Sequence, residues 1–323
     1  MKILVYGAGA IGMAFGGFLS RFHEVTLLGR AAHLEAIRRR GLRVQGIWGK
    51  HCFRGFRLAD SVRSRAVAAG GFDRILLCVK SYDTEAAAHE LKKIAGPATA
   101  VVSLQNGLGN LETLSRFLPR RQLIGGRVIF GVEVPEPGAI RVTVIANPTA
   151  LGEASCRNMT ARVRQMAADF TRAGLPSTAC KNIEGVLWAK VVYNAALNPL
   201  ASLLGCHYGF LGEHPLTRSL MNDVIAEIYA VTKKSGIPMK PETAGAYQKL
   251  FYSHLVPSTY DHHPSMLQDL QCGRRTEIEA LNGAVVRAAA RLRVPVPVNR
   301  YLYRELLRRD HASGRRKRAL HAA

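Results

Sequence analysis

Three polar residues with the spacing of one helix face stand in an otherwise apolar stretch of the second half of the chain. Lys190, Asn194 and Asn198 follow one another at intervals of four residues within the segment 187–199. In a helix this spacing places all three side chains on one side. A lysine and two carboxamides in apolar surroundings require partners, because unpaired polar groups are costly there. Two hypotheses fit the pattern: internal hydrogen bonds, or a face that binds a carboxylate and a hydroxyl and supplies a proton.

A glycine-rich turn follows the first predicted strand, which spans residues 2–6. Gly7, Gly9 and Gly12 match the pattern G-x-G-x-x-G. In dinucleotide-binding folds the first glycine permits a tight turn, the second lets the pyrophosphate approach the main chain, and the third lets helix and strand pack closely. The pyrophosphate then lies at the helix N-terminus, where free N–H groups favour an anion. We therefore predict a dinucleotide site at this turn, which comprises Gly7, Ala8, Gly9, Ala10, Ile11 and Gly12.

The end of the second predicted strand indicates which dinucleotide is bound. Chains that bind NAD usually carry an acidic residue there, about 20 residues after the glycines, that holds the ribose hydroxyls. This chain has Arg30 at that point, and its first acidic residue afterwards is Glu35, inside the next predicted helix. A cation without a carboxylate favours the 2′-phosphate of NADP. We therefore expect NADPH as the cofactor, with Arg30 among its ligands.

Two further predicted strands end in polar residues. Lys80 follows the strand at residues 75–79, and Asn106 follows the strand at residues 100–104. Because ligands of an open parallel sheet bind outside the carboxyl ends of its strands, we expect both residues to lie beside Arg30 and the glycine turn. Lys80 suits a phosphate. Asn106 offers both a donor and an acceptor to a carboxamide or to a substrate oxygen.

The order of the predicted elements indicates two domains. In the first half, short apolar runs alternate with amphipathic segments, which is the rhythm of a parallel sheet covered by helices on both faces. From about residue 158 the pattern is almost entirely helical. We expect an α/β fold: a Rossmann-type NADP-binding domain at residues 1–180, an all-helical substrate domain at 181–310, and a basic, disordered tail at 311–323. Residues 139–145 and 150–152 are expected to add strands at the end of the parallel sheet.

Helices are predicted at residues 11–22, 31–40, 82–93, 183–204, 216–235, 241–251, 275–293 and 299–309. Further strands are predicted at residues 25–28 and 123–125.

Composition excludes several classes of protein. Apolar residues make up 48% of the chain, yet no apolar run reaches the roughly 18 residues that cross a bilayer. The six cysteines are scattered without a C-x-x-C pair, so neither a zinc site nor a disulfide framework is indicated. We expect a cytoplasmic protein without a bound metal. The sequence allows a homodimer but does not specify an oligomeric state.

The net charge of +22 at pH 7 is high. A basic surface can bind nucleic acid or steer small anions toward a cleft. The charge is spread along the chain, its one dense run is residues 315–318, and no nucleic-acid-binding motif accompanies it. We favour a generally basic surface, and nucleic-acid binding is the alternative.

Four segments together resemble the ketopantoate reductase (2-dehydropantoate 2-reductase) family. They occur in the order that the family shows and span nearly the whole chain, to about residue 307. The helix at 190–199 and the last segment are much more distinctive than the glycine motif. The segments are residues 7–12, 103–107, 190–199, and 265–269 with 276–279 and 282–283.

The resemblance implies a Rossmann domain followed by a helical domain like the C-terminal domain of 6-phosphogluconate dehydrogenase, with the active site in the cleft between them. Lys190 matches the catalytic lysine that protonates the forming alkoxide, and Glu277 matches an acidic partner that organises the lysine and contacts the cofactor. Asn106 matches a residue that touches cofactor and substrate. Further matches are to substrate ligands, at Asn194, Asn198 and Ser265, and to ligands of the NADP phosphate, at Arg30 and Lys80.

The sequence departs from the family at the far end of the implied substrate pocket. Many members carry asparagine at two further positions, which here are Tyr208 and His262, and a serine where this chain has Pro264. These changes leave the reductase chemistry intact but reshape the surroundings of the distal hydroxyl of the substrate. The leading hypothesis is NADPH-dependent reduction of ketopantoate to (R)-pantoate, a step toward pantothenate and coenzyme A. The alternatives are reduction of another small 2-keto acid and dinucleotide sensing without turnover.

Overall fold

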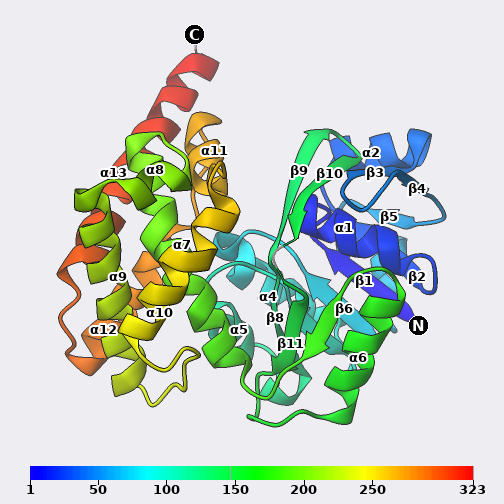
Figure 1. The fold of residues 1–323 in the computed structure, drawn as a ribbon. Helices are drawn as coiled ribbons and strands as arrows, with labels where there is room; N and C mark the ends of the chain where they lie inside the picture. The colour runs from blue at the N-terminus through cyan, green and yellow to red at the C-terminus, as the bar shows by residue number, and fades with distance from the viewer. Residues whose placement is uncertain (146, 323) are drawn as a thin grey trace. The chain divides into compact units, whose positions relative to one another are not determined.

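The computed structural model describes the backbone of residues 1–145 and 147–322, and the side chains of residues 1–144 and 147–310. The chain forms two compact units (Figure 1). The first comprises Met1–Asn106 and Asn110–Ile183, and the second comprises Gly107–Gly109 and Glu184–Ala323. The division after Ile183 lies close to the boundary that we expected at residue 180.

An eight-stranded sheet forms the centre of the first unit, in the order β12-β11-β8-β7-β6-β1-β2-β5. Every neighbouring pair is parallel except β11 and β8. Tyr6 of β1 pairs with Leu28 of β2 and with Leu77 of β6, so these three strands end level. The strands are β1 (Lys2–Tyr6), β2 (Glu24–Leu28), β5 (Arg57–Ala59), β6 (Arg74–Leu77), β7 (Ala100–Ser103), β8 (Leu123–Arg127), β11 (Thr149–Glu153) and β12 (Ser177–Ala179).

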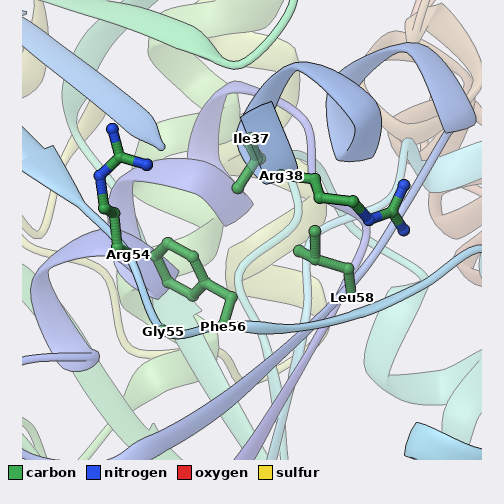
Figure 2. A pocket seen from close by; sticks show the side chains of 6 residues that line it. All are labelled: Ile37, Arg38, Arg54, Gly55, Phe56 and Leu58. Carbon is green, nitrogen blue, oxygen red and sulfur yellow. The ribbon is translucent and has the colours of Figure 1, made fainter. Parts of the chain in front are cut away.

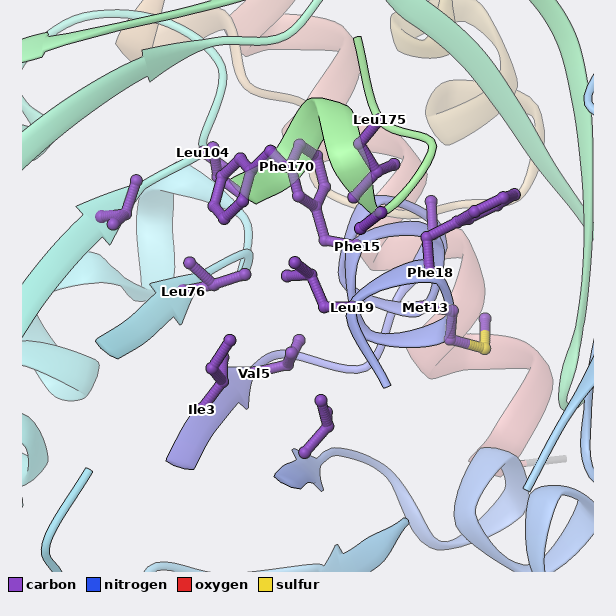
Figure 3. Close-up of a cluster of buried hydrophobic side chains, with 14 of the residues drawn as sticks. Ile3, Val5, Met13, Phe15, Phe18, Leu19, Leu76, Leu104, Phe170 and Leu175 are labelled. Carbon is purple, nitrogen blue, oxygen red and sulfur yellow. The ribbon is translucent and has the colours of Figure 1, made fainter. Parts of the chain in front are cut away.

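Both faces of this sheet are buried, as expected for a parallel sheet between two layers of helices. Alternate residues of β1 enter different cores: Ile3 and Val5 pack on one face, and Leu4 packs on the other. Figure 3 shows the first core, in which the ring of Phe15 meets the ring of Phe170 edge to face at 5.4 Å. The helices of this unit are α1 (Ala10–Leu19), α2 (Ala31–Arg40), α3 (Arg65–Ala68), α4 (Thr84–Ile94), α5 (Asn110–Ser115) and α6 (Ala161–Arg172).

A second, four-stranded sheet was not predicted. Its order is β4-β3-β10-β9, with β3 (Leu42–Gly46), β4 (His51–Phe53), β9 (Phe130–Glu136) and β10 (Ala139–Ile145). The prediction that residues 139–145 extend the parallel sheet was therefore wrong, whereas β11 does lie in that sheet. β10 instead folds back on β9 as an antiparallel hairpin, through a turn at Gly138 with a φ of +75°. A tight turn pairs a strand with its neighbour in sequence before any distant sheet edge is available.

The second unit is helical, and α7 (Ile183–Leu204) contributes several fully buried residues to its core, including Val192, Ala195 and Ala196. The other helices are α8 (Tyr208–Glu213), α9 (Pro215–Lys234), α10 (Ala244–Leu250), α11 (Ser265–Gln271), α12 (Asn282–Leu292) and α13 (Pro297–Ala322). Across the part of the chain that the structure describes, no helix is both long and apolar enough to span a membrane.

Two boundaries in this unit differ from the predictions. The helix expected at residues 275–293 begins only at Asn282, because Thr276 is held by Asp310: its main-chain N–H and its hydroxyl both donate to that carboxylate. The helix expected to end at residue 309 continues to Ala322, so α13 includes most of the segment that we expected to be disordered.

Candidate active site

Two glycines of the predicted cofactor turn are required by the fold itself. Gly7 has a φ of +109°, and a Cβ atom on it would lie 2.8 Å from the main-chain nitrogen of Val79. A Cβ atom on Gly12 would lie 2.1 Å from the carbonyl oxygen of Gly7. Any side chain at either position would therefore displace the backbone, and both glycines serve the close packing of α1 against the strands.

Gly9 is different, because the protein does not require a glycine there. Its φ is −88°, which any residue adopts, and a Cβ atom would meet nothing within 4 Å. Gly9 is also the residue that precedes α1, whose first N–H groups have no acceptor within the helix. A glycine that leaves space in front of unpaired N–H groups fits a pyrophosphate bound against the main chain. The turn is therefore compatible with the predicted dinucleotide.

Arg30 is held beside this turn by the residue that precedes it. A Cβ atom on Gly29 would lie 2.6 Å from the Cβ of Ala8, so only glycine permits this approach. The main-chain N–H of Ala8 donates to the carbonyl of Leu28 at 2.8 Å, which ties the turn to the end of β2. Arg30 itself is exposed and immediately precedes α2. The sequence analysis missed Gly29, although its place next to the predicted phosphate ligand was a signal.

His33 lies one helical turn further along α2, close enough to Arg30 for the charge of the guanidinium to affect its pKa. Burial lowers the pKa of His33, and the Arg30 guanidinium lowers it further. Nδ1 of His33 accepts the main-chain N–H of Gly138 at 3.3 Å. The neutral imidazole therefore fits this position, and the positive charge at this corner belongs to Arg30.

Lys80 and Asn106 occupy neighbouring loops that a buried hydrogen-bond network joins. Lys80 is half-buried after β6, and Asn106 is half-buried after β7. The hydroxyl of Ser81 donates to the main-chain oxygen of Asn106 at 2.7 Å. The carboxamide of Asn110 donates to the same oxygen at 2.9 Å. The loops that follow β6 and β7 are thus fixed to one another at the edge where Arg30 and the glycine turn also lie.

The network continues into the sheet through Gln105 and Thr84. The Gln105 carboxamide donates to the carbonyl of Val79 at 3.1 Å and to the hydroxyl of Thr84 at 2.8 Å, and it accepts the hydroxyl of Ser103 at 3.0 Å. Thr84 in turn donates to Asn110 at 2.9 Å. Buried polar groups that are satisfied in this way hold their loops rigidly. The sequence analysis did not identify these residues as supports of the site.

In the second unit, α7 carries the three residues that were predicted to share a face. Lys190 and Asn194 are half-buried, and Asn198 is buried with 7% of its surface exposed. One helix therefore does bring the lysine and both carboxamides together on successive turns. Their neighbours Val191 and Ala195 point into the core.

Pro199 interrupts the hydrogen bonding of α7 at the end of this face. It has no N–H to donate to the carbonyl of Ala195, four residues earlier. The carboxamide of Asn282 donates to that carbonyl instead, at 3.2 Å, and also to Oδ1 of Asn299 at 3.0 Å. The hydrogen-bond network continues to α9, because the carboxamide of Asn299 donates to the carboxylate of Glu227 at 2.8 Å. Buried residues of α12 and α13 thus complete the helix that carries the polar face.

Ser265 and Glu277, the other predicted residues of this unit, lie on separate elements. Ser265 is exposed and is the first residue of α11, directly after the buried Pro264. Glu277 is 9% exposed and lies in the turn before α12, where its carbonyl accepts the N–H of Ala280 at 3.0 Å. Within the described side chains, no group of three or more His, Cys, Asp or Glu residues could hold a metal ion.

A cavity of about 340 Å³ lies elsewhere in the first unit. It is lined by the later part of α2 and the segment that leads into β5, whereas Arg30 lies before the start of α2. Figure 2 shows that the guanidinium groups of Arg38 and Arg54 extend away from each other, so no polar groups converge there. The cavity does not contain any of the predicted site residues; its lining is Ile37, Arg38, Arg54, Gly55, Phe56 and Leu58.

Comparison with known proteins identifies the family of the chain. Residues 3–155 match the family model of ketopantoate reductase PanE/ApbA, and residues 182–309 match that of its C-terminal part. The chain is 38% identical over 304 residues to 2-dehydropantoate 2-reductase of Aquifex aeolicus (strain VF5), covering 94% of each chain.

Solved structures have the same fold. The crystal structure of a PanE/ApbA family ketopantoate reductase from Ralstonia eutropha JMP134 has a TM-score of 0.86 and 32% identity, covering 97% of this chain and 99% of that chain. A ternary structure of D-mandelate dehydrogenase with NADH and anilino(oxo)acetate shares the fold, with a TM-score of 0.85, 23% identity and the same coverage. The chain therefore belongs to the ketopantoate reductase family of dinucleotide-dependent oxidoreductases.

Proposed function

We propose that this chain is a cytoplasmic enzyme that reduces 2-dehydropantoate (ketopantoate) to (R)-pantoate with NADPH, in the synthesis of pantothenate and coenzyme A. The observation that carries the proposal is the shared face of Lys190, Asn194 and Asn198 on α7, in a chain of the ketopantoate reductase family. A cation in line with two carboxamides is suited to a small acid that carries a carbonyl and a hydroxyl.

NADPH would be held at the carboxyl edge of the sheet in the first unit. The main chain from Gly7 to Gly12 would bind the pyrophosphate, and Arg30 and Lys80 would pair with the 2′-phosphate. Asn106 would contact both cofactor and substrate, and Glu277 would contact the cofactor. The space at Gly9 and the exposed guanidinium of Arg30 support this assignment.

Lys190 would stabilise and then quench the charge that develops on the substrate. When bound, NADPH supplies the hydride that reaches C2 of the keto acid. As the carbonyl oxygen becomes an alkoxide, the ammonium of Lys190 attracts the growing negative charge and gives up one proton to that oxygen. Glu277 would keep the lysine charged and in place. Asn194, Asn198 and Ser265 would orient the acid by hydrogen bonds.

A second candidate is reduction of another small 2-keto acid. The observation in its favour is the buried hydrogen bond of 2.6 Å from the Tyr208 hydroxyl to Asn198, since that bond occupies the carboxamide oxygen of a residue expected to bind the substrate. The likeness of fold to D-mandelate dehydrogenase is compatible with this alternative.

A panel of 2-keto acids tests both candidates. The loss of NADPH absorbance gives kcat/KM for each acid, and chiral chromatography identifies the product formed from ketopantoate. The proposal expects ketopantoate to be the best substrate and (R)-pantoate to be the product. A higher kcat/KM for another acid would favour the second candidate.

A further inference from the structure

Tyr208 occupies a buried position next to the polar face of α7. It is the first residue of α8, and 3% of its surface is exposed. Its main-chain N–H donates to the carbonyl of His262 at 3.1 Å, and the two rings lie 5.1 Å apart. The ring also meets Tyr193 edge to face, with the centroids 5.9 Å apart. The position of the Tyr208 ring is therefore fixed by contacts with two different elements.

The hydroxyl of Tyr208 donates to Oδ1 of Asn198 at 2.6 Å. Burial raises the pKa of Tyr208 well above its ordinary value, so the phenol keeps its proton and acts as a donor. In the described part of the chain, Asn198 is the one hydrogen-bond partner of this hydroxyl. If the carboxamide were rotated by half a turn, Nδ2 would face the hydroxyl, and the buried O–H would lose its acceptor.

The neighbouring hydroxyl of Tyr193 has its own hydrogen-bond partner on another element. It is bonded to the hydroxyl of Thr259 at 2.7 Å, and Thr259 donates its own proton to the carbonyl of Leu255 at 2.8 Å. Tyr193 is therefore the donor toward Thr259, and among the described residues no hydrogen bond joins the two tyrosine hydroxyls. The Asn198 carboxamide thus turns Oδ1 toward the Tyr208 hydroxyl.

We propose that Tyr208 is a positioning residue that fixes the Asn198 carboxamide so that Nδ2, a donor, is the group that Asn198 offers to the substrate. The inference rests on the proposed function, since it assumes that the Lys190 face binds the 2-keto acid. It adds a chemical requirement: the substrate atom opposite Asn198 accepts a hydrogen bond, as a carboxylate oxygen or a hydroxyl lone pair does.

The test is a double-mutant cycle with Y208F, N198A and both together, assayed with the 2-keto acid that the wild type reduces most efficiently. Y208F frees the carboxamide to rotate, so KM should rise about threefold to tenfold while kcat stays within about twofold. In the N198A background the same substitution should change KM by less than about twofold, because the group that it positions is gone. An equal rise of KM in both backgrounds, or no rise in either, would overturn the proposal.

Tyr229→Phe is the matched control. Tyr229 is a similarly buried tyrosine of the second unit, and its hydroxyl donates to the carbonyl of Pro241 at 2.8 Å. Y229F should lower the melting temperature about as much as Y208F does, without changing KM. A change of KM in Y229F equal to that in Y208F would show that general loosening, and not Asn198, sets the affinity.

Neutron diffraction from crystals grown of the wild-type protein is the second measurement, and it applies even if Y208F does not fold. The deuterium of the Tyr208 hydroxyl should point at Oδ1 of Asn198, and two deuterium atoms should lie on the atom facing away from Tyr208. Deuterium atoms on the side facing Tyr208 would refute the positioning role. If the wild type reduced no 2-keto acid, the proposed function would be wrong, whatever the orientation of the carboxamide.

Discussion

The carboxamide of Asn282 donates to the main-chain oxygen of Ala195 at 3.2 Å, and so it replaces a helical hydrogen bond that Pro199 cannot make. Both Asn282 and Ala195 are fully buried. The proline lies next to Asn198 in sequence. The interruption of α7 thus falls within its predicted substrate face, and Asn282 compensates for it.

Asn282→Ala should destabilise the second unit. It removes the donor to Ala195 and to Asn299, and it leaves two buried acceptors short of a partner, which we expect to cost about 2–4 kcal/mol in the free energy of unfolding. Urea titration monitored by circular dichroism measures the change. Pro199→Ala restores a main-chain N–H opposite Ala195, so the cost of N282A should be smaller in the P199A background. If N282A lowered the free energy of unfolding equally in both backgrounds, the hydrogen bond from Asn282 to Ala195 would not contribute to stability.

Acid should destabilise the first unit through His33. Its pKa in the folded chain lies below its ordinary value of 6.5, because of burial and the charge of Arg30. Well above pH 6.5 the imidazole is neutral in both states and its contribution does not vary with pH. As the pH falls below 6.5 the unfolded chain binds the proton first, so the unfolding free energy decreases until the folded imidazole also titrates.

The readout for His33 is the slope of unfolding free energy against pH between about 6.5 and 4.5, compared with that of His33→Gln. Glutamine can accept the N–H of Gly138 but carries no titrating group, so its slope should be shallower than that of the wild type. Superimposable slopes would mean that His33 titrates alike in the folded and unfolded chain.

Arg30→Ala should weaken NADPH selectively. A charge-assisted contact contributes roughly 1.5–3 kcal/mol, so kcat/KM for NADPH should fall about 10-fold to 100-fold, while that for NADH should barely change. Arg38→Ala is the matched control, since it removes the same charge from α2 at an exposed site paired with Glu35. If R30A lowered kcat/KM equally for both cofactors, Arg30 would not be reading the phosphate.

Lys190→Ala should remove most of the turnover but leave NADPH binding intact. General acid catalysis contributes on the order of 10²–10⁴ in rate, and the alanine variant has no proton to give. Stopped-flow measurement of kcat and fluorescence titration of NADPH separate the two effects. Lys249→Ala, at an exposed lysine of α10, should behave like the wild type. A kcat near the wild-type value in K190A would assign the proton to another donor.

The elements with strong periodic patterns were predictable from sequence. The strand, glycine turn and helix from Lys2 to Leu19 follow from local rules, and the predicted bounds of α2 and α7 agree with the structure. Glu277 was predicted as a site residue from the family resemblance alone. It lies in an irregular turn in which Thr276 donates to Asp310, and no periodic sequence pattern indicates such a turn.

Features that depend on contacts between distant segments were not predictable. The short strands β3 and β4 join a sheet only because the β9–β10 hairpin supplies an edge. Similarly, Gln105 and Thr84 are ordinary polar residues in sequence, and only the fold shows that they join the loops of Lys80 and Asn106. The bond between Tyr208 and Asn198 requires α8 to pack against α7, which no local pattern specifies.

The most direct test of the account compares ketopantoate with 2-ketoisovalerate, which shares the branch but lacks the hydroxymethyl group. A site that bonds a hydroxyl rejects the analogue without it, by as much as roughly 10⁴-fold, because its own polar groups are left unpaired. With purified protein and NADPH, we expect kcat/KM for ketopantoate to exceed that for 2-ketoisovalerate by at least about 100-fold. Equal values, or a preference for 2-ketoisovalerate, would contradict the assignment of ketopantoate as the substrate and of Asn194 and Asn198 as the groups that recognise its hydroxyl.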